Sequence, residues 1–157
     1  MIKVIVSDLS WTILFPKDPA YKGRLNDLYL QLTAEGKEIS FFDYFRLDQD
    51  LLNVYRLFKD KVKLVIFTSG TIQENPELSM KLKEVFDEII SAKEFSSTAK
   101  NDSSVYLELV KKLGVKPDEI VLIDDDPDYV AAAKKSGCKT IKYVNASAAK
   151  GELQGLT

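Results

Sequence analysis

Hydrophobic residues gather in short continuous runs along the chain, and these runs alternate with stretches in which apolar residues recur at helical spacing. Such runs predict buried strands, because strands that are covered on both faces of a sheet are apolar throughout. The predicted strands lie at 2–7, 63–68, 88–91, 119–124 and 139–144. Each of them is bounded by polar or turn-forming residues.

The stretches between these runs carry apolar residues three and four positions apart, which predicts amphipathic helices. Asn75-Pro76 marks the start of one of them, and glycines at 36, 114 and 137 follow the ends of three others. The predicted helices cover 24–35, 41–59 with a break near Asp48, a segment from Asn75 to about 86, 103–113, and about 128–136. The weakly patterned tail 146–157 predicts no element.

Strands that alternate with helices indicate βαβ units and a mainly parallel sheet. The expected fold class is α/β, a Rossmann-like three-layer sandwich around that central sheet. The length of 157 residues fits one domain, 1–157. After the first strand, turn-forming residues at 16, 19 and 23 precede the predicted helix over 24–35.

Polar residues follow three of the predicted strands directly. In an open parallel sheet, ligands bind beyond the carboxyl ends of the strands. The residues expected at this edge are Asp8, Ser10 and Thr12; Thr68, Ser69 and Gly70; Asp124, Asp125, Asp126 and Asp128; and Lys100 from a loop. Each feature alone also fits a turn, a helix cap or a surface lysine. Their coincidence at one edge favours a functional site.

Composition narrows the chemistry of that site. The net charge of −2 provides no basic field for nucleic acid, and no apolar run approaches the roughly 20 residues that span a bilayer. The single cysteine, Cys138, and an N-terminus without a signal-peptide pattern fit a cytoplasmic protein. The chain contains no histidine, which excludes Ser-His-Asp and Cys-His nucleophiles and His-ligated zinc.

Carboxylates gathered at one edge repel each other unless a cation lies among them. Mg²⁺ prefers oxygen ligands, so we expect it to bind Asp8, Asp124 and Asp125. A phosphoryl group then needs a compensating cation and donors, which Lys100 and the Thr68 hydroxyl supply. A carboxylate beside that phosphoryl group is a nucleophile for an aspartyl-phosphate, and the expected substrate is a phosphorylated small molecule.

Four segments in this order resemble the motifs of the haloacid dehalogenase (HAD) superfamily. They are VIVSDLSWT, VIFTSG, AKNDSSVYLELVKKLGV and IVLIDDDPDYVAAAKKSGCKTI. Phospho-acceptor receiver domains also combine acids, Thr and Lys, but they place the acidic pair early in the chain. Here the single Asp is early and the acidic cluster is late, so the order of the motifs favours the HAD resemblance.

The resemblance implies a role for each matching residue. Asp8 becomes the nucleophile and a magnesium ligand, and the backbone carbonyl of Ser10 a further ligand. Thr68 holds a phosphoryl oxygen, and the substrate-binding residues are Ser10, Ser69 and Gly70. Lys100 balances the charge between nucleophile and phosphate. Asp125, with Asp124 next to it, completes the metal site, whereas Tyr129 stands where many members have a second acid.

Two positions of the first motif depart from the family pattern. Ser10 replaces the second Asp, the general acid and base of the phosphatases, and a hydroxyl cannot take over that role near neutral pH. Trp11 replaces a usual Gly and is interpreted as a core or hinge aromatic rather than a pocket wall. The expected function is a Mg²⁺-dependent phosphohydrolase of reduced activity, in which Asp126 or Asp128 is a possible substitute acid.

Two other functions remain open. A degenerate domain that binds phosphate or a protein partner is the main alternative. Dehalogenase or phosphonatase chemistry ranks lower, because the acidic pair favours a magnesium site that dehalogenases lack. The resemblance implies that about 15–45 is a small helical, cap-like insertion, because this family inserts caps after the first motif. Its aromatic run FFDYF is expected to pack internally. The sequence predicts neither the substrate nor the oligomeric state.

Overall fold

The computed structural model describes residues 1–96 and 99–157. Its centre is a parallel five-stranded sheet with the strand order β5-β4-β1-β6-β7. The strands are β1 (Val4–Ser7), β4 (Lys63–Thr68), β5 (Glu88–Ser91), β6 (Ile120–Asp124) and β7 (Lys139–Lys142). The chain builds outward from β1 through β4 and β5, and then returns to the other side of β1. The predicted α/β class and parallel sheet are confirmed.

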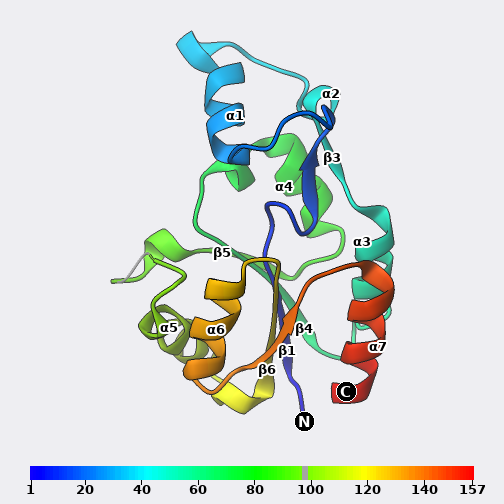
Figure 1. Ribbon diagram of the computed structural model, residues 1–157, viewed down its shortest axis with the longest axis vertical. Helices are drawn as coiled ribbons and strands as arrows, with labels where there is room; N and C mark the ends of the chain where they lie inside the picture. Colours follow the sequence, from blue (N-terminus) through cyan, green and yellow to red (C-terminus); the bar gives the residue numbers. More distant parts are fainter. Residues whose placement is uncertain (97–98) are drawn as a thin grey trace.

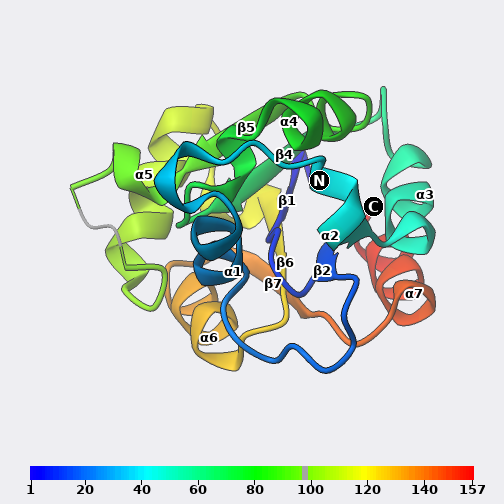
Figure 2. The same ribbon diagram turned by 90° about the horizontal axis from the view of Figure 1, so that it is seen from above.

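Helices cover both faces of this sheet, which makes three layers (Figures 1 and 2). One face carries α5 (Ser103–Leu113) and α6 (Pro127–Lys135), and the other carries α3 (Gln49–Arg56), α4 (Pro76–Lys83) and α7 (Ala146–Leu156). Successive strand residues point to opposite faces, so each strand contributes to two hydrophobic cores. In the described parts of the chain, four short 3₁₀ helices lie in the loops: η1 (Ala34–Gly36), η2 (Ile72–Glu74), η3 (Ala92–Glu94) and η4 (Pro117–Glu119).

Local signals explain where most helices begin and end. The Asn75 side chain accepts hydrogen bonds from two backbone amides at the start of α4, and Pro76 occupies the first helical position. Gly114 ends α5 with a φ of +67°, a left-handed conformation that glycine adopts without strain. The predicted start of α4 at Asn75-Pro76 and the predicted end of α5 before Gly114 are confirmed.

The tail 146–157 is a helix, α7, which the sequence pattern did not predict. Asn145 caps it by accepting a hydrogen bond from the Ala148 amide. Ala149 and Leu153, four residues apart, are its buried residues. This stripe is too narrow to be distinguished in the sequence, and α7 gains its burial from packing beside α3.

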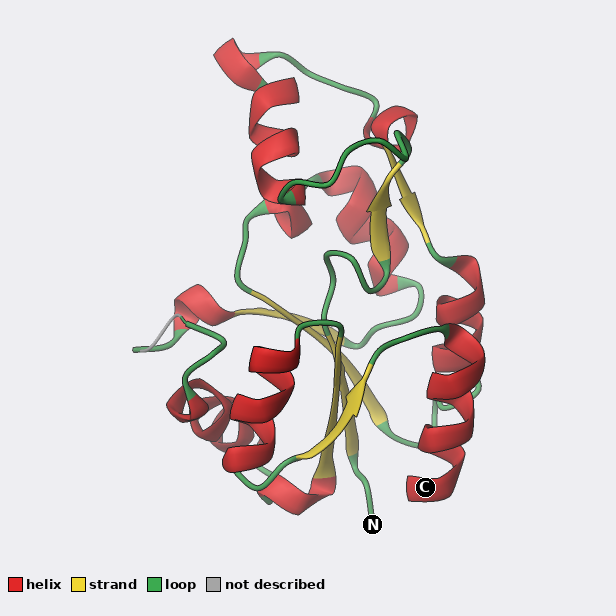
Figure 3. Cartoon of the chain, viewed as in Figure 1, coloured by secondary structure: helices red, strands yellow, loops and turns green. Residues whose placement is uncertain are grey.

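The segment between β1 and α3 stands above the carboxyl ends of the sheet (Figure 3). It contains α1 (Leu25–Leu32), η1 and α2 (Phe41–Tyr44), and it is bounded by an antiparallel pair of strands, β2 (Leu14–Pro16) and β3 (Phe45–Leu47). The predicted helix over 41–59 is therefore wrong in its middle, where β3 separates α2 from α3. The break near Asp48 is confirmed, because the Asp48 side chain caps α3.

The aromatic run at 41–45 packs internally, as the sequence predicted. Phe41 and Phe45 are fully buried, and their rings stack with centroids 4.6 Å apart. Tyr29 of α1 packs against both rings, which ties the helix to the strand pair.

Among the described residues, no helix has the length and apolar character that crossing a bilayer requires.

Candidate active site

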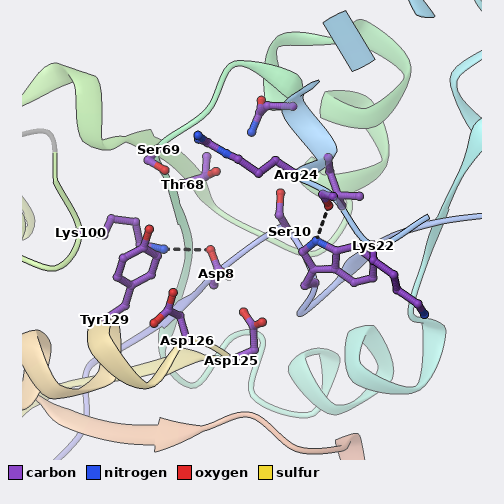
Figure 4. A pocket seen from close by; sticks show the side chains of 14 residues that line it. Asp8, Ser10, Lys22, Arg24, Thr68, Ser69, Lys100, Asp125, Asp126 and Tyr129 are labelled. Carbon is purple, nitrogen blue, oxygen red and sulfur yellow. Dashed lines mark hydrogen bonds and ion pairs between the residues drawn. The ribbon is translucent and has the colours of Figure 1, made fainter. Parts of the chain in front are cut away.

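The ends of the three central strands bring the motif residues to one edge of the sheet. Asp8 directly follows β1, Thr68 ends β4 and Asp124 ends β6. Ser7 is in register with Ile66 and Ile123 of the flanking strands, so the residues that follow lie side by side. The sheet therefore assembles a site from segments that are distant in the sequence, and the close view in Figure 4 shows it.

Lys100 lies at the centre of the site. Its Nζ is 2.9 Å from Asp8 Oδ1 and 2.9 Å from Asp124 Oδ2, and the lysine is only 2% exposed. The ammonium group also lies 4.9 Å from the centre of the Tyr129 ring, in a cation–π arrangement. Burial alone would lower the pKa of Lys100, but the attraction of Asp8 and Asp124 outweighs it and raises the pKa. The lysine is therefore charged at neutral pH.

Three carboxylates lie close together in the site, and Lys100 contacts two of them, Asp8 and Asp124. Oxygens of Asp8, Asp124 and Asp125 all lie within 4.8 Å of one another. Burial, and then repulsion by Asp8, raises the pKa of Asp124 and of Asp125 above the ordinary carboxyl value. The Thr12 hydroxyl lies 3.3 Å from Asp8 Oδ2 and 3.2 Å from Asp125 Oδ1, so it donates to one of them at a time. The cluster retains an excess of negative charge, which favours a bound cation.

A cavity of about 340 Å³ opens above this cluster. Its walls come from the first motif, the insertion, the loops after β4 and β6, the start of α6 and Lys100. The lining residues are Asp8, Ser10, Trp11, Lys22, Gly23, Arg24, Leu25, Asn26, Thr68, Ser69, Lys100, Asp125, Asp126 and Tyr129. Most of the candidate site residues named from the sequence therefore face one shared space.

Four candidate residues lie outside the cavity wall, namely Thr12, Gly70, Asp124 and Asp128. Asp124 is fully buried beneath it, where Oδ2 accepts from Lys100 and Oδ1 accepts from the Asp126 amide. Gly70 is close to Asn26 of α1, so that an added Cβ would collide with the Asn26 side chain. Its carbonyl accepts a hydrogen bond of 2.6 Å from Gln73. Gly70 thus allows the insertion to approach the loop after β4.

Ser10 lines the cavity, and its hydroxyl is buried without a hydrogen-bond partner among the described residues. Of the two acids that the sequence offered as substitutes, Asp126 lines the cavity. Its Oδ1 caps α6 by accepting from the Asp128 amide. Asp128 itself is not part of the wall.

Trp11 adopts a left-handed backbone conformation with a φ of +62°, which favours glycine. Its indole packs edge to face on Phe15, and Nε1 donates a hydrogen bond of 3.2 Å to the Gly23 carbonyl. Trp11 both packs against the core and lines the cavity, so its interpretation as only a core or hinge aromatic was incomplete.

The sequence did not identify several lining residues as part of a site. Lys22, Arg24 and Asn26 belong to the insertion, whose position over the sheet depends on contacts that no local pattern encodes. Tyr129 was noted only as a departure from an acid, yet its ring faces Lys100. The sequence offered one signal for this part of the cavity wall, namely the basic residues Lys22 and Arg24 that follow the first motif.

Known structures share this fold. A putative β-phosphoglucomutase from Thermotoga maritima aligns with a TM-score of 0.65 at 18% identity, covering 96% of this chain and 92% of the other. A HAD family enzyme from Bacteroides thetaiotaomicron, in complex with magnesium and inorganic phosphate, aligns with a TM-score of 0.64 at 14% identity, covering 92% and 95%. At these identities the likeness concerns the fold alone.

Two sequence relatives match part of this chain. Enolase-phosphatase E1 of Sulfurihydrogenibium sp. (strain YO3AOP1) is 26% identical over 96 residues, which are 55% of this chain and 39% of the relative. Enolase-phosphatase E1 of Persephonella marina (strain DSM 14350 / EX-H1) is 40% identical over 43 residues, 27% and 19% of the two chains. The chain thus spans well under half of these relatives.

The family model for haloacid dehalogenase-like hydrolases matches residues 46–143, which is more than half of the chain. With the strand order and the motif residues described above, this match establishes that the chain belongs to the haloacid dehalogenase-like hydrolases.

Proposed function

We propose that this chain is a Mg²⁺-dependent phosphohydrolase that acts on a phosphorylated small molecule through an aspartyl-phosphate on Asp8. The observation that carries the proposal is the buried contact of Lys100 with Asp8 and Asp124 at the base of the cavity. A nucleophile at the cavity surface, held beside a fixed cation, suits attack on an anionic phosphoryl group. The segment 15–45 then acts as a small cap.

The residues present fit a magnesium ion. The donor set consists of oxygens, and three carboxylates against one lysine leave a surplus negative charge. Asp8 and Asp125 would hold the ion, with the Ser10 carbonyl as a further ligand. Asp124 is better suited to an indirect role, because both of its oxygens already accept hydrogen bonds. When bound, Mg²⁺ supplies positive charge to the phosphoryl oxygens.

The proposed reaction has two steps. In the first, Asp8 Oδ2 forms a bond to phosphorus while the bond to the leaving oxygen breaks, and that oxygen takes up a proton. In the second, water attacks phosphorus, the bond to Asp8 breaks, and inorganic phosphate is released with loss of the water's proton. Lys100 holds Asp8 Oδ1 and balances charge, and Thr68, 4% exposed, donates to a phosphoryl oxygen.

Ser10 limits both proton transfers. Its hydroxyl neither protonates a leaving oxygen nor activates water near neutral pH, and a general acid or base contributes about 10²–10⁴-fold in rate. Good leaving groups, such as those of aryl and acyl phosphates, depend least on an acid. We therefore propose that the protein hydrolyses such esters faster than alkyl phosphates.

Replacing Ser10 by aspartate is expected to raise kcat on an alkyl phosphate by about 10²-fold, because it restores a carboxyl group at that position. The gain on p-nitrophenyl phosphate is expected to be smaller. Steady-state kinetics on both esters measures the effect, and Ser10→Asn is the matched control without an acid. A folded Ser10→Asp variant that is no faster than Ser10→Asn would contradict this account of Ser10.

The proposed function is tested by hydrolysis of p-nitrophenyl phosphate and acetyl phosphate, with added Mg²⁺ and after treatment with EDTA. Turnover that requires the metal is expected. The unpartnered Ser10 hydroxyl and the missing acid favour one alternative, a non-catalytic domain that binds phosphate. Absence of turnover on both esters, with phosphate binding still seen by calorimetry, would decide for that alternative.

A further inference from the structure

Two walls of the cavity carry side chains of opposite charge. Asp125 and Asp126 come from the loop after β6, whereas the insertion contributes two cations, Lys22 and Arg24. In Figure 4 the Arg24 side chain extends across the cavity in the direction of Ser69, on the side away from the two acids. Lys22 is directed away from Asp8, to the side opposite the Arg24 guanidinium. The wall that carries Arg24 is therefore positive and separate from the acidic cluster.

Hydrogen bonds on either side of Arg24 fix its position. The preceding carbonyl, that of Gly23, accepts from Trp11 Nε1 at 3.2 Å, which connects it to the loop that carries Asp8. Two residues further on, Asn26 Oδ1 accepts from the amides of Thr71 and Ile72 at 2.9 Å each, just after Thr68 and Ser69. The backbone at Arg24 is thus tied to two loops of the proposed active site.

Tyr21 adds a third constraint, because its hydroxyl donates a hydrogen bond of 2.7 Å to the Arg24 carbonyl. A backbone that is held before the ligand arrives loses less conformational entropy when the ligand binds. The fold therefore sets the distance from the Arg24 backbone to the proposed nucleophile, which limits the range that the guanidinium can reach.

Arg24 differs from the other arginines of the chain in having no side-chain partner. Arg46 lies over the Phe15 ring at 4.7 Å, and Arg56 donates to Asn53 Oδ1 at 2.7 Å. In the described ranges 1–96 and 99–157, no ion pair and no hydrogen bond involves the Arg24 guanidinium. Its donors are free for a ligand, and the planar guanidinium matches two oxygens of a carboxylate or phosphate.

We propose that the Arg24 guanidinium forms a second anion subsite of this cavity. The substrate is then a small phosphate ester that carries a second oxyanion, either a carboxylate or another phosphate. This inference rests on the proposed function, because the first phosphate is assigned to Asp8, Lys100 and Thr68. A cavity of about 340 Å³ restricts such a substrate to the size of a small phosphorylated acid or bisphosphate.

The test compares pairs of esters that differ in one anionic group. Glycerol 3-phosphate and 3-phosphoglycerate form the carboxylate pair, and 3-hydroxypropyl phosphate and 1,3-propanediol bisphosphate form the phosphate pair. The wild-type protein is expected to show a higher kcat/KM for the ester that carries the second anionic group, in at least one of the two pairs. The pair with the larger ratio identifies the second group as carboxylate or phosphate.

Arg24→Gln is expected to lower that ratio about tenfold, since the lost contact is a charge-assisted hydrogen bond at an exposed side chain. Arg24→Lys is expected to recover part of the ratio. Arg56→Gln, which removes the same charge from α3 away from the cavity, is the matched control and is expected to keep the wild-type ratio. Circular dichroism verifies that each variant is folded.

Three other outcomes overturn the inference, and they can be distinguished from one another. Equal kcat/KM values within both pairs for the wild-type protein would show that no second anion is recognised. If Arg24→Gln lowered both members of a pair equally, the guanidinium would act on the transferred phosphoryl group instead. In both cases the proposed phosphohydrolase stands. Absence of turnover on these esters and on p-nitrophenyl phosphate would remove the proposed function and this inference together.

Discussion

Asp8→Asn is expected to lower the turnover of p-nitrophenyl phosphate by about 10⁴-fold or more, because an amide oxygen does not replace the carboxylate as nucleophile. The variant is expected to stay folded, since the amide oxygen still accepts from Lys100 and one negative charge leaves a crowded cluster. Steady-state kinetics and urea unfolding measure the two effects separately.

Asp118→Asn is the matched control for this substitution. Asp118 is an exposed aspartate at the amino end of β6, opposite the edge that carries the site, so its change is expected to leave turnover unaltered. If Asp8→Asn retained the wild-type rate while folded, Asp8 would not be the nucleophile, and the assigned chemistry would be wrong.

Lys100→Met is expected to abolish activity and to lower the free energy of unfolding at neutral pH by about 3–5 kcal/mol. The methionine leaves Asp8 and Asp124, 8% and 0% exposed, without their shared cation. Urea unfolding provides the measurement, and Lys112→Met is its matched control. Lys112 pairs with Glu94 at the surface, so its loss is expected to cost less than about 1 kcal/mol.

The stability lost in Lys100→Met is also expected to shrink as the pH falls. The pKa of Asp124 is already raised in the folded protein by burial and by Asp8, and removing Lys100 raises it further. A carboxyl group with a raised pKa in the folded state binds its proton more tightly there. The buried charge therefore lowers the stability fully above that raised pKa, and this cost declines as the pH falls through it toward the ordinary carboxyl pKa. A difference between variant and wild type that is equal at pH 5 and pH 7.5, or no larger than that of Lys112→Met, would contradict the buried triad.

The convergence of Asp8, Lys100, Asp124 and Asp125 was predictable from the sequence. Parallel strands place their carboxyl ends at one edge, so the residues that follow apolar runs must meet there whatever their separation along the chain. The structure brings these four side chains together as predicted. Their roles in binding and catalysis remain predictions that the experiments above address.

The parts that the sequence did not predict depend on contacts between distant segments. β3 is three residues long and exists through its pairing with β2, while helix-forming residues lie on both sides of it. The contribution of Arg24 to the cavity likewise depends on how Trp11 and Asn26 anchor the insertion. No periodicity along the chain encodes such contacts, because they are set by tertiary packing.

The most direct test of the central claim is chemical trapping of the intermediate on Asp8. The protein is incubated with acetyl phosphate and Mg²⁺, quenched, reduced with borohydride and digested, and its peptides are sequenced by mass spectrometry. Reduction converts an aspartyl-phosphate to homoserine. Homoserine at position 8, formed only when the metal and the phosphate donor are both present, is the expected result. Turnover without homoserine at position 8, or with the label at another aspartate, would contradict the account.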